Sequence, residues 1–401
     1  MVRAMSQTET YGRIDALLEI RARDHPRRIE PAWSDLLAAV DEAAVRLLTG
    51  VEAADEPEAL PAFYDRPVFV VGHRKTGTTL LLDLLDAHAQ LAVLPGESNH
   101  FLIFLPRVEN LPAEEIAAEA QRWWMLRLIS PSGIPPFWAL GRPWELAEDP
   151  YAVFSRRLVE LVAANPGRDV LGMAAVALDT ATGRPTAPRA WVEKTPGQEH
   201  ELDAILARYP QARFVHLLRD PRSVAAAIAR LDRATGQTTD MVEVGLTLRS
   251  SFAAAERNAR RLGDGSYLLL RYEDLVARPQ PAMRRVADFL EIDWADSLLT
   301  PTVGGIEATS NSVWAERRVT GQIEDRRLDL WREELDERSA ELVSGAVGRV
   351  GRRLGYDLPR PRRAGTLAGV LSRRARLAVG TRRRAVQARV QKKTFSSPAK
   401  P

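Results

Sequence analysis

A short apolar run, a loop bounded by glycines and a helical repeat follow one another in residues 68–90, VFVVGHRKTGTTLLLDLLDAHAQ. The continuous β-branched run is typical of a strand buried on both faces of a parallel sheet. Gly72 and Gly77 are five residues apart, as in the nucleotide-binding GxxxxGK[ST] loop. Backbone N–H groups between Gly72 and Thr79 can converge on an anion at the start of the helix, where the helix dipole also favours negative charge. The segment therefore predicts an anion-binding strand, loop and helix.

The lysine of this loop is displaced. Thr78 follows Gly77 where the nucleotide-binding loop has its lysine, and the lysine present is Lys75, inside the loop. Thr78 and Thr79 add hydroxyl donors, while the ammonium would reach a bound anion from another side. Thr79 also matches the position that holds magnesium in nucleoside triphosphatases. A magnesium-dependent kinase or other phosphotransferase is thus one hypothesis, favoured by the glycine spacing and disfavoured by Thr78.

Lysine is rare in this chain. Of 56 basic residues only five are lysines, and Lys75 and Lys194 are the two that precede the C-terminal segment. Both lie in motif-like strings, GHRKTGTT and WVEKTPG. A compact, movable ammonium differs chemically from a planar guanidinium, so both lysines are candidate functional residues.

Strand-like and helix-like segments alternate after the loop, which predicts an α/β fold of the P-loop-NTPase-like type: three layers, with a central parallel sheet flanked by helices. The expected strands lie in 67–71, 189–197, 212–221 and 267–270, and the expected helices in 78–88, 201–210, 222–231, 282–292 and 331–356. Helical spacing from Ile14 to Leu48, interrupted near Pro26 and Pro31, predicts an N-terminal helical lead-in. We divide the chain into this lead-in with its connector (1–66), a main domain (67–358) and a tail (359–401).

Composition argues against several classes of protein. The chain has no cysteine, and its six histidines show no metal-binding spacing, so we expect neither disulfides nor a metal site. No apolar run approaches the roughly 18 residues of a membrane helix, and the N-terminus is charged where a signal peptide is apolar. These features predict a cytoplasmic protein.

The C-terminal tail is strongly basic. Residues 360–401 contain 13 Lys and Arg and no acid, although the net charge of the chain is only +3. Arginine clusters among Leu and Val suit a helix lying on an anionic membrane surface, a nucleic-acid-binding arm, or a solvated disordered extension. We expect peripheral contact with the inner membrane surface as a possible use of the tail, and no specific nucleic acid partner. The sequence leaves the oligomeric state open.

Four strings, in order, resemble sulfotransferases that use 3′-phosphoadenosine 5′-phosphosulfate (PAPS), in particular the bacterial and tyrosylprotein branch. They are RKTGTTLL (74–81), EKTP (193–196), FVHLLRDPRSVAAAIARL (214–231) and LLLRYEDLVARP (268–279). The resemblance extends from Val68 to Asp357. It implies PAPS as the sulfuryl donor and residues 67–358 as the catalytic domain.

The resemblance implies three catalytic residues. Lys75 would contact the bridging oxygen and the sulfuryl group, and Lys194 would be a second cation. Glu97, within LDAHAQLAVLPGESNHF (85–101), would be the base for the acceptor hydroxyl. His73 and His100 are the competing bases. Because two lysines can stabilise the reacting oxygens, no magnesium is required.

The resemblance also implies a set of donor-binding residues. Arg219 would bind the 3′-phosphate, and Ala227 stands where the family usually has a serine, so Ser223 is considered as a replacement. A late loop, SNSVWAERRVTG (310–321), offers further basic and hydroxyl groups. The expected set is Gly72, His73, Arg74, Lys75, Thr76, Gly77, Thr78, Thr79, Arg219, Ser223, Arg317 and Arg318.

The acceptor is the least constrained part of the prediction. Four tryptophans in RWWMLRLISPSGIPPFWALGRPW (122–144) could pack a core or hold a ring over the donor. We expect transfer to a hydroxyl, or an amine, of a carbohydrate, lipid-linked or other small acceptor. A third hypothesis is non-enzymatic: an anion-binding module with a membrane- or nucleic-acid-binding tail.

Overall fold

The computed structural model describes residues 6–23, 30–48, 59–129, 138–185, 187–234, 236–308, 320–323 and 328–360. These residues form two compact units. The first contains the described residues up to Arg219 and those from Ala254 to Ile323, and the second contains Asp220–Ala253 and the described residues from Leu328 onward. Arg317, Arg318 and the basic tail beyond Arg360 lie outside the described residues.

The first unit is built on a five-stranded sheet in the order β2-β3-β1-β4-β5, in which all strands are parallel. The strands are β1 (Pro67–Val71), β2 (Leu91–Val93), β3 (Ala190–Lys194), β4 (Arg213–Leu218) and β5 (Tyr267–Arg271). Four of them are the predicted strands. The edge strand β2 was not predicted, because three residues are too few to show a period.

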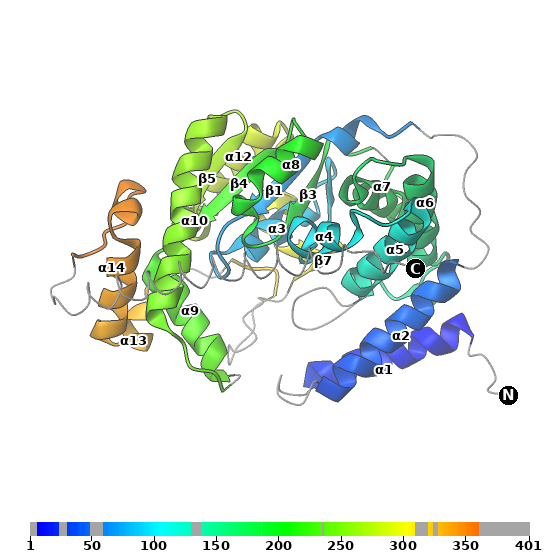
Figure 1. The fold of residues 1–401 in the computed structure, drawn as a ribbon, viewed down its shortest axis with the longest axis horizontal. Helices are drawn as coiled ribbons and strands as arrows, with labels where there is room; N and C mark the ends of the chain where they lie inside the picture. Colours follow the sequence, from blue (N-terminus) through cyan, green and yellow to red (C-terminus); the bar gives the residue numbers. More distant parts are fainter. Residues whose placement is uncertain are drawn as a thin grey trace, which may run out of the picture. The chain divides into compact units, whose positions relative to one another are not determined.

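Alternate side chains of the strands enter two separate hydrophobic cores, which is the pattern of a sheet covered on both faces. On β1, Phe69 and Val71 join the core that contains Trp191 and Phe214, whereas Val68 and Val70 join the other core. The predicted three-layer α/β fold is therefore confirmed. Figure 1 shows β1, β3 and β4 among the helices of this unit.

The helices of the first unit divide between the two cores. Residues of α1, α2, α5, α6, α7 and α8 belong to the core around Phe69, and residues of α3 and α12 belong to the core around Val70. The α-helices are α1 (Gln7–Arg23), α2 (Glu30–Leu48), α3 (Thr78–Asp86), α4 (Leu105–Val108), α5 (Ala113–Ile129), α6 (Pro150–Ala164), α7 (Val170–Thr182), α8 (Leu202–Arg208), α11 (Tyr272–Ala277) and α12 (Pro279–Leu290). The shorter elements are η2 (Ala62–Asp65), the π-helical turn η3 (His100–Phe104), η4 (Pro143–Glu145), η5 (Gln198–His200), η6 (Asp296–Leu299) and the hairpin β6 (Thr302–Val303) and β7 (Ile306–Glu307).

The second unit contains α9 (Pro221–Ala234), α13 (Trp331–Glu334), α14 (Glu337–Arg353) and the first half of α10 (Met241–Leu262), which continues into the first unit. The single helix expected over 331–356 is wrong, because the chain breaks it at Leu335 and kinks at Gly348, whose φ angle is 46°. Leu335 is extended and Asp336 caps a new helix by accepting a hydrogen bond from the Ser339 amide at 2.7 Å. Asp is a preferred N-cap residue, so the helix restarts there. Among the described residues, no helix is long and apolar enough to cross a membrane.

Candidate active site

The predicted functional residues meet at the carboxyl edge of the sheet, because β1 lies between β3 and β4. The loop after β1 carries Lys75, β3 ends at Lys194, and Arg219 directly follows β4. The Arg219 guanidinium donates a hydrogen bond to the Lys75 carbonyl oxygen at 3.1 Å and stacks on the Tyr272 ring at 4.2 Å. Ligands of parallel α/β sheets bind at this edge.

The loop after β1 adopts a conformation that few side chains tolerate. Gly72, Lys75 and Gly77 have φ angles of 139°, 70° and 101°. A Cβ atom on Gly77 would lie 2.3 Å from the Tyr272 ring, and one on Gly72 would lie 2.6 Å from the Leu217 carbonyl oxygen. Lys75 is a non-glycine residue in the left-handed region, which is uncommon and typical of functional turns.

Two of the loop amides are used inside the protein. The Gly72 amide donates to Glu199 Oε2 at 3.3 Å, and the Thr76 amide donates to the His73 carbonyl oxygen at 3.2 Å. Helix α3 begins at Thr78, so the amides of Thr78, Thr79 and Leu80 have no partner within the helix, whereas the Leu81 amide donates to the Gly77 carbonyl oxygen at 3.1 Å. The Gly72 amide is thus paired with Glu199, and the amides at the start of α3 are the loop donors best placed for an anion. The assignment of Gly72 to donor binding stays a prediction.

A cluster of positive charge surrounds Lys75. Burial lowers the pKa of the Lys75 ammonium, and the positive charges of Arg74, Lys194 and Arg219 lower it further, with Glu97 as the opposing carboxylate. Like charges disfavour the charged form of each member. A bound anion would relieve this repulsion, so the electrostatics of the site fit an anionic ligand.

Lys194 and Glu97 form an ion pair. The Lys194 Nζ atom donates to Glu97 Oε1 at 2.9 Å, and the two side chains are 1% and 33% exposed. The lysine is thus buried at the end of β3 while the carboxylate remains open to solvent. The structure brings all three predicted catalytic residues, Lys75, Lys194 and Glu97, within electrostatic reach of one another.

Residues 67–296 match the model of the Sulfotransferase family. The chain belongs to the sulfotransferase family. Protein-tyrosine sulfotransferase A of Caenorhabditis elegans is 24% identical over 327 residues, covering 77% of this chain and 75% of that protein. Omega-hydroxy-beta-dihydromenaquinone-9 sulfotransferase Stf3 of Mycobacterium bovis is 26% identical over 262 residues, covering 56% of this chain and 63% of that protein.

A solved structure shares the fold of this sulfotransferase. The sulfotransferase domain of the Synechococcus PCC 7002 olefin synthase has a TM-score of 0.50 at 22% identity, over 77% of this chain and 99% of that domain. Within the part of the sulfotransferase that the structure describes, no group of three or more His, Asp or Glu residues is arranged to hold a metal ion.

The two histidines considered as competing bases lie in other surroundings. His100 is buried and its Nε2 atom contacts the Asp169 carboxylate at 3.1 Å. His73 Nδ1 lies 2.9 Å from the Arg74 carbonyl oxygen, and burial lowers the pKa of its imidazole. Glu97 alone of the three is paired with a lysine of the sulfotransferase site, which favours it as the base.

The remaining predicted residues divide by location. Ser223 lies in the second unit, where its hydroxyl donates to the Leu328 carbonyl oxygen at 3.1 Å. Arg317 and Arg318 lie outside the described residues and stay predictions. Of the four tryptophans, Trp124 and Trp138 are buried in the core of the sulfotransferase, and Trp144 is 44% exposed.

Sequence reasoning did not anticipate three charged residues near the site. Arg127 of α5 donates through Nε to the carbonyl oxygens of Glu97 and Ser98, at 3.0 Å each. Burial raises the pKa of the Asp83 carboxyl well above its usual range, against the positive charge of Lys194. Asp169 has no motif of its own. A signal existed only for Asp83, as a carboxylate flanked by leucines within the apolar helix after the loop.

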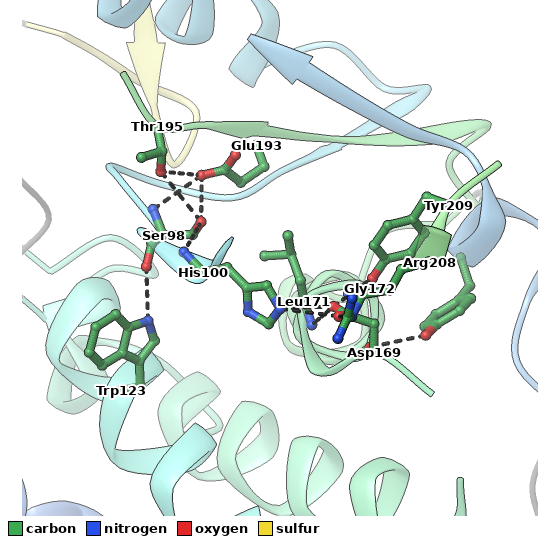
Figure 2. Close-up of polar contacts among 11 residues, drawn as sticks. Ser98, His100, Trp123, Asp169, Leu171, Gly172, Glu193, Thr195, Arg208 and Tyr209 are labelled. Carbon is green, nitrogen blue, oxygen red and sulfur yellow. Dashed lines mark hydrogen bonds and ion pairs between the residues drawn. The ribbon is translucent and has the colours of Figure 1, made fainter. Parts of the chain in front are cut away.

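Asp169 is the centre of a buried polar cluster that includes His100 of η3 (Figure 2). Its carboxylate accepts hydrogen bonds from the Leu171 amide and the Tyr209 hydroxyl, both at 2.9 Å, and contacts Arg208 Nε at 3.0 Å. Burial acts to raise the pKa of Asp169, but His100 and these hydrogen bonds outweigh it, and the pKa is lowered. A lowered pKa means that the ionised carboxylate stabilises the fold above the pKa of unfolded Asp, and that this stabilisation is lost as the pH falls through the folded pKa.

Asp169→Asn should therefore lower the free energy of unfolding by about 3 kcal/mol at neutral pH, the scale for breaking a buried charge pair. The deficit should shrink below about pH 4, the range where Asp becomes protonated. Urea unfolding of both proteins across this range measures it. Asp149→Asn is the matched control, because Asp149 also caps a helix and Asn is as good an N-cap. A deficit independent of pH would contradict the assignment of the effect to the carboxylate charge.

Proposed function

We propose that this sulfotransferase moves a sulfuryl group from PAPS to a hydroxyl, or an amine, of a small, carbohydrate or lipid-linked acceptor. The observation that carries the proposal is the cluster of Lys75, Arg74, Lys194 and Arg219 around a left-handed loop, with Glu97 as its carboxylate. The names of two relatives support hydroxyl acceptors, since one is a protein-tyrosine sulfotransferase and the other acts on an omega-hydroxy menaquinone.

The residues at the sheet edge fit this donor. The amides at the start of α3 and the hydroxyls of Thr78 and Thr79 suit the 5′-phosphate, since helix N-termini bind phosphate. Arg219 suits the 3′-phosphate, because a guanidinium binds phosphate with paired donors. Lys75, whose ammonium is destabilised by like charges, suits the bridging oxygen of the donor. The donor supplies an activated sulfuryl group, and the chain supplies charge and position.

The proposed reaction is an in-line displacement. The acceptor oxygen forms a bond to sulfur, the bond between sulfur and the bridging oxygen breaks, and its electron pair leaves on the phosphate of adenosine 3′,5′-bisphosphate. Glu97 accepts the proton of the acceptor hydroxyl, for which its one-third exposed carboxylate is accessible. Lys75 stabilises negative charge on the leaving oxygen. Lys194 orients Glu97 and stabilises negative charge on the sulfuryl oxygens.

Calorimetry with adenosine 3′,5′-bisphosphate, ADP and magnesium-ATP tests the proposed donor. The bisphosphate should bind most tightly, and without magnesium, because its 3′-phosphate adds an interaction with Arg219. Arg219→Ala should remove the preference for the bisphosphate over ADP, and Arg278→Ala, at an exposed arginine paired with Asp274, should not. Tight binding of magnesium-ATP with no binding of the bisphosphate would refute the proposal.

A further inference from the structure

Glu193 adjoins the Lys194–Glu97 ion pair from within the protein. Its Oε1 atom accepts hydrogen bonds from the Ser98 hydroxyl at 2.5 Å, the Thr195 hydroxyl at 2.6 Å and the Ser98 amide at 3.3 Å. Two consecutive residues of one segment, Glu97 and Ser98, thus pair with two consecutive residues of another, Lys194 and Glu193. We call Glu193, Ser98 and Thr195 the Glu193 latch, and Figure 2 shows its contacts.

The segment that carries Glu97 has little regular structure of its own. Gly96 and Asn99 have φ angles of 75° and 51°, and residues 94–99 belong to no helix or strand. The Asn99 amide also donates to Thr195 Oγ1, at 2.9 Å. The position of Glu97 is therefore set by contacts to neighbouring elements. Those to β3 are the hydrogen bond from the Leu94 amide to the Val192 carbonyl oxygen at 2.9 Å, the Lys194–Glu97 pair and the hydrogen bonds of the latch.

The opposite side of this segment is held by α5. Arg127 Nε and Trp123 Nε1 both donate to the Ser98 carbonyl oxygen, at 3.0 and 2.9 Å, and the Arg127 guanidinium stacks on the Trp123 ring at 3.6 Å. These contacts use backbone carbonyl groups. They hold the backbone of the segment against α5 and involve neither the Glu97 carboxylate nor the Ser98 hydroxyl.

The chemistry of Glu193 is unusual for a residue that serves stability alone. Its side chain is buried, and its Oε2 atom has no hydrogen-bond partner among the residues that the structure describes. Burial raises the pKa of its carboxyl. Leaving a buried carboxylate oxygen without a hydrogen bond destabilises the folded protein, so stability alone does not explain a carboxyl at this position. The buried carboxyl instead holds Ser98, the neighbour of Glu97 in the Lys194–Glu97 ion pair.

We propose that Glu193 is a positioning residue, which holds the Glu97 carboxylate against the Lys194 ammonium by fixing Ser98 through the latch. The inference rests on the proposed function, in which Glu97 and Lys194 act on the acceptor. Glu193 itself touches neither donor nor acceptor. Its loss should therefore slow transfer while leaving donor binding intact.

The scarcity of lysine allows a direct test without any acceptor. The chain has five lysines, so biosynthetic labelling with lysine carrying ¹³C at the ε position gives five signals, and Lys75→Arg and Lys194→Arg assign the two at the site. Glu193→Ala should change the chemical shift and the titration of the Lys194 signal. Glu193→Gln should preserve both, because the amide oxygen can accept the same three hydrogen bonds.

Transfer kinetics and binding supply the second readout. Glu193→Ala should lower kcat about 10- to 100-fold, the scale for residues that orient a functional group, with the Kd for adenosine 3′,5′-bisphosphate unchanged. Glu193→Gln should restore most of the rate. If Glu193→Ala does not fold, Ser98→Ala replaces it, with Ser155→Ala as the control. Ser155 of α6 is also a buried serine, and its hydroxyl accepts a hydrogen bond from Gln121 of α5 at 2.8 Å.

The outcomes separate this inference from the proposed function. An unchanged Lys194 signal in both Glu193→Ala and Ser98→Ala overturns the positioning role, whatever the enzyme transfers. The same holds if Glu193→Gln is as defective as Glu193→Ala. A changed Lys194 signal in a protein that binds no bisphosphate supports the latch and refutes the donor instead.

Discussion

Lys75→Met is expected to lower the rate of sulfuryl transfer by about 10³-fold, the upper scale for removing one preorganised donor from developing charge. Methionine keeps the length and most of the volume of lysine but removes the ammonium. The φ angle of 70° at this position applies to both side chains equally, so the backbone strain cancels in the comparison. The measurement is release of adenosine 3′,5′-bisphosphate from the donor in the presence of phenol and alcohol acceptors.

Donor binding should also acquire a different dependence on pH. Because the pKa of Lys75 is lowered in the free site, its ammonium loses its proton at a lower pH than an ordinary lysine. Affinity for the anionic donor should therefore fall as the pH rises through this lowered pKa, and Lys75→Met should abolish that part of the slope. Calorimetry with adenosine 3′,5′-bisphosphate at several pH values gives both results.

Two further variants show whether Lys75 acts as an ammonium or merely as a positive charge. Lys75→Arg keeps the charge with a planar, delocalised group, so it should recover donor affinity more than transfer rate. Arg278→Met removes an exposed charge elsewhere and should change neither. Full activity of Lys75→Met would remove the ammonium from the mechanism.

The sheet could be predicted from sequence because its strands leave a local signal. Each of the four predicted strands contains a short run of apolar residues, as expected where both faces of the sheet are covered. On β1, for example, Val68 and Phe69 enter different cores. The edge strand β2 is too short for such a signal. The break at Leu335 was missed because one helical period continues across it, and only the capping geometry of Asp336 marks the new start.

The site could be predicted from sequence where its functional residues lie in short sequence motifs. Lys75 lies in the loop after β1, Lys194 ends β3 and Arg219 directly follows β4, so the topology of a parallel sheet brings them to one edge. Glu97 came from family resemblance, and the structure pairs it with Lys194. The residues that contact the segment around Glu97 could not be predicted in this way. Arg127 contacts the Glu97 carbonyl oxygen and Asp169 contacts His100, each between elements far apart in sequence. No spacing in one sequence encodes such contacts.

Glu97→Gln should lower the rate of transfer to an alcohol or phenol by about 10²-fold or more, the usual scale for losing a general base. The amide oxygen can still accept the hydrogen bond from Lys194 Nζ, so the geometry of the pair is kept and the loss is chemical. Donor affinity should not fall, because Glu97 repels rather than binds the phosphates. Calorimetry with adenosine 3′,5′-bisphosphate checks this second expectation.

The nature of the acceptor provides the sharper test of Glu97. An acceptor whose hydroxyl is already ionised, such as 4-nitrophenolate in mildly alkaline buffer, has no proton to give up, so it should not need a base. Glu97→Gln should therefore be strongly defective with an aliphatic alcohol and nearly normal with 4-nitrophenolate. A general effect on geometry would lower both rates alike.

A control variant separates the role of Glu97 from the loss of any carboxylate. Glu109→Gln, which removes an exposed carboxylate at the end of α4, is the matched control and should leave the rates with both acceptors unchanged. If Glu97→Gln keeps the wild-type rate with the alcohol, Glu97 serves only as the partner of Lys194, and the acceptor proton leaves by another group.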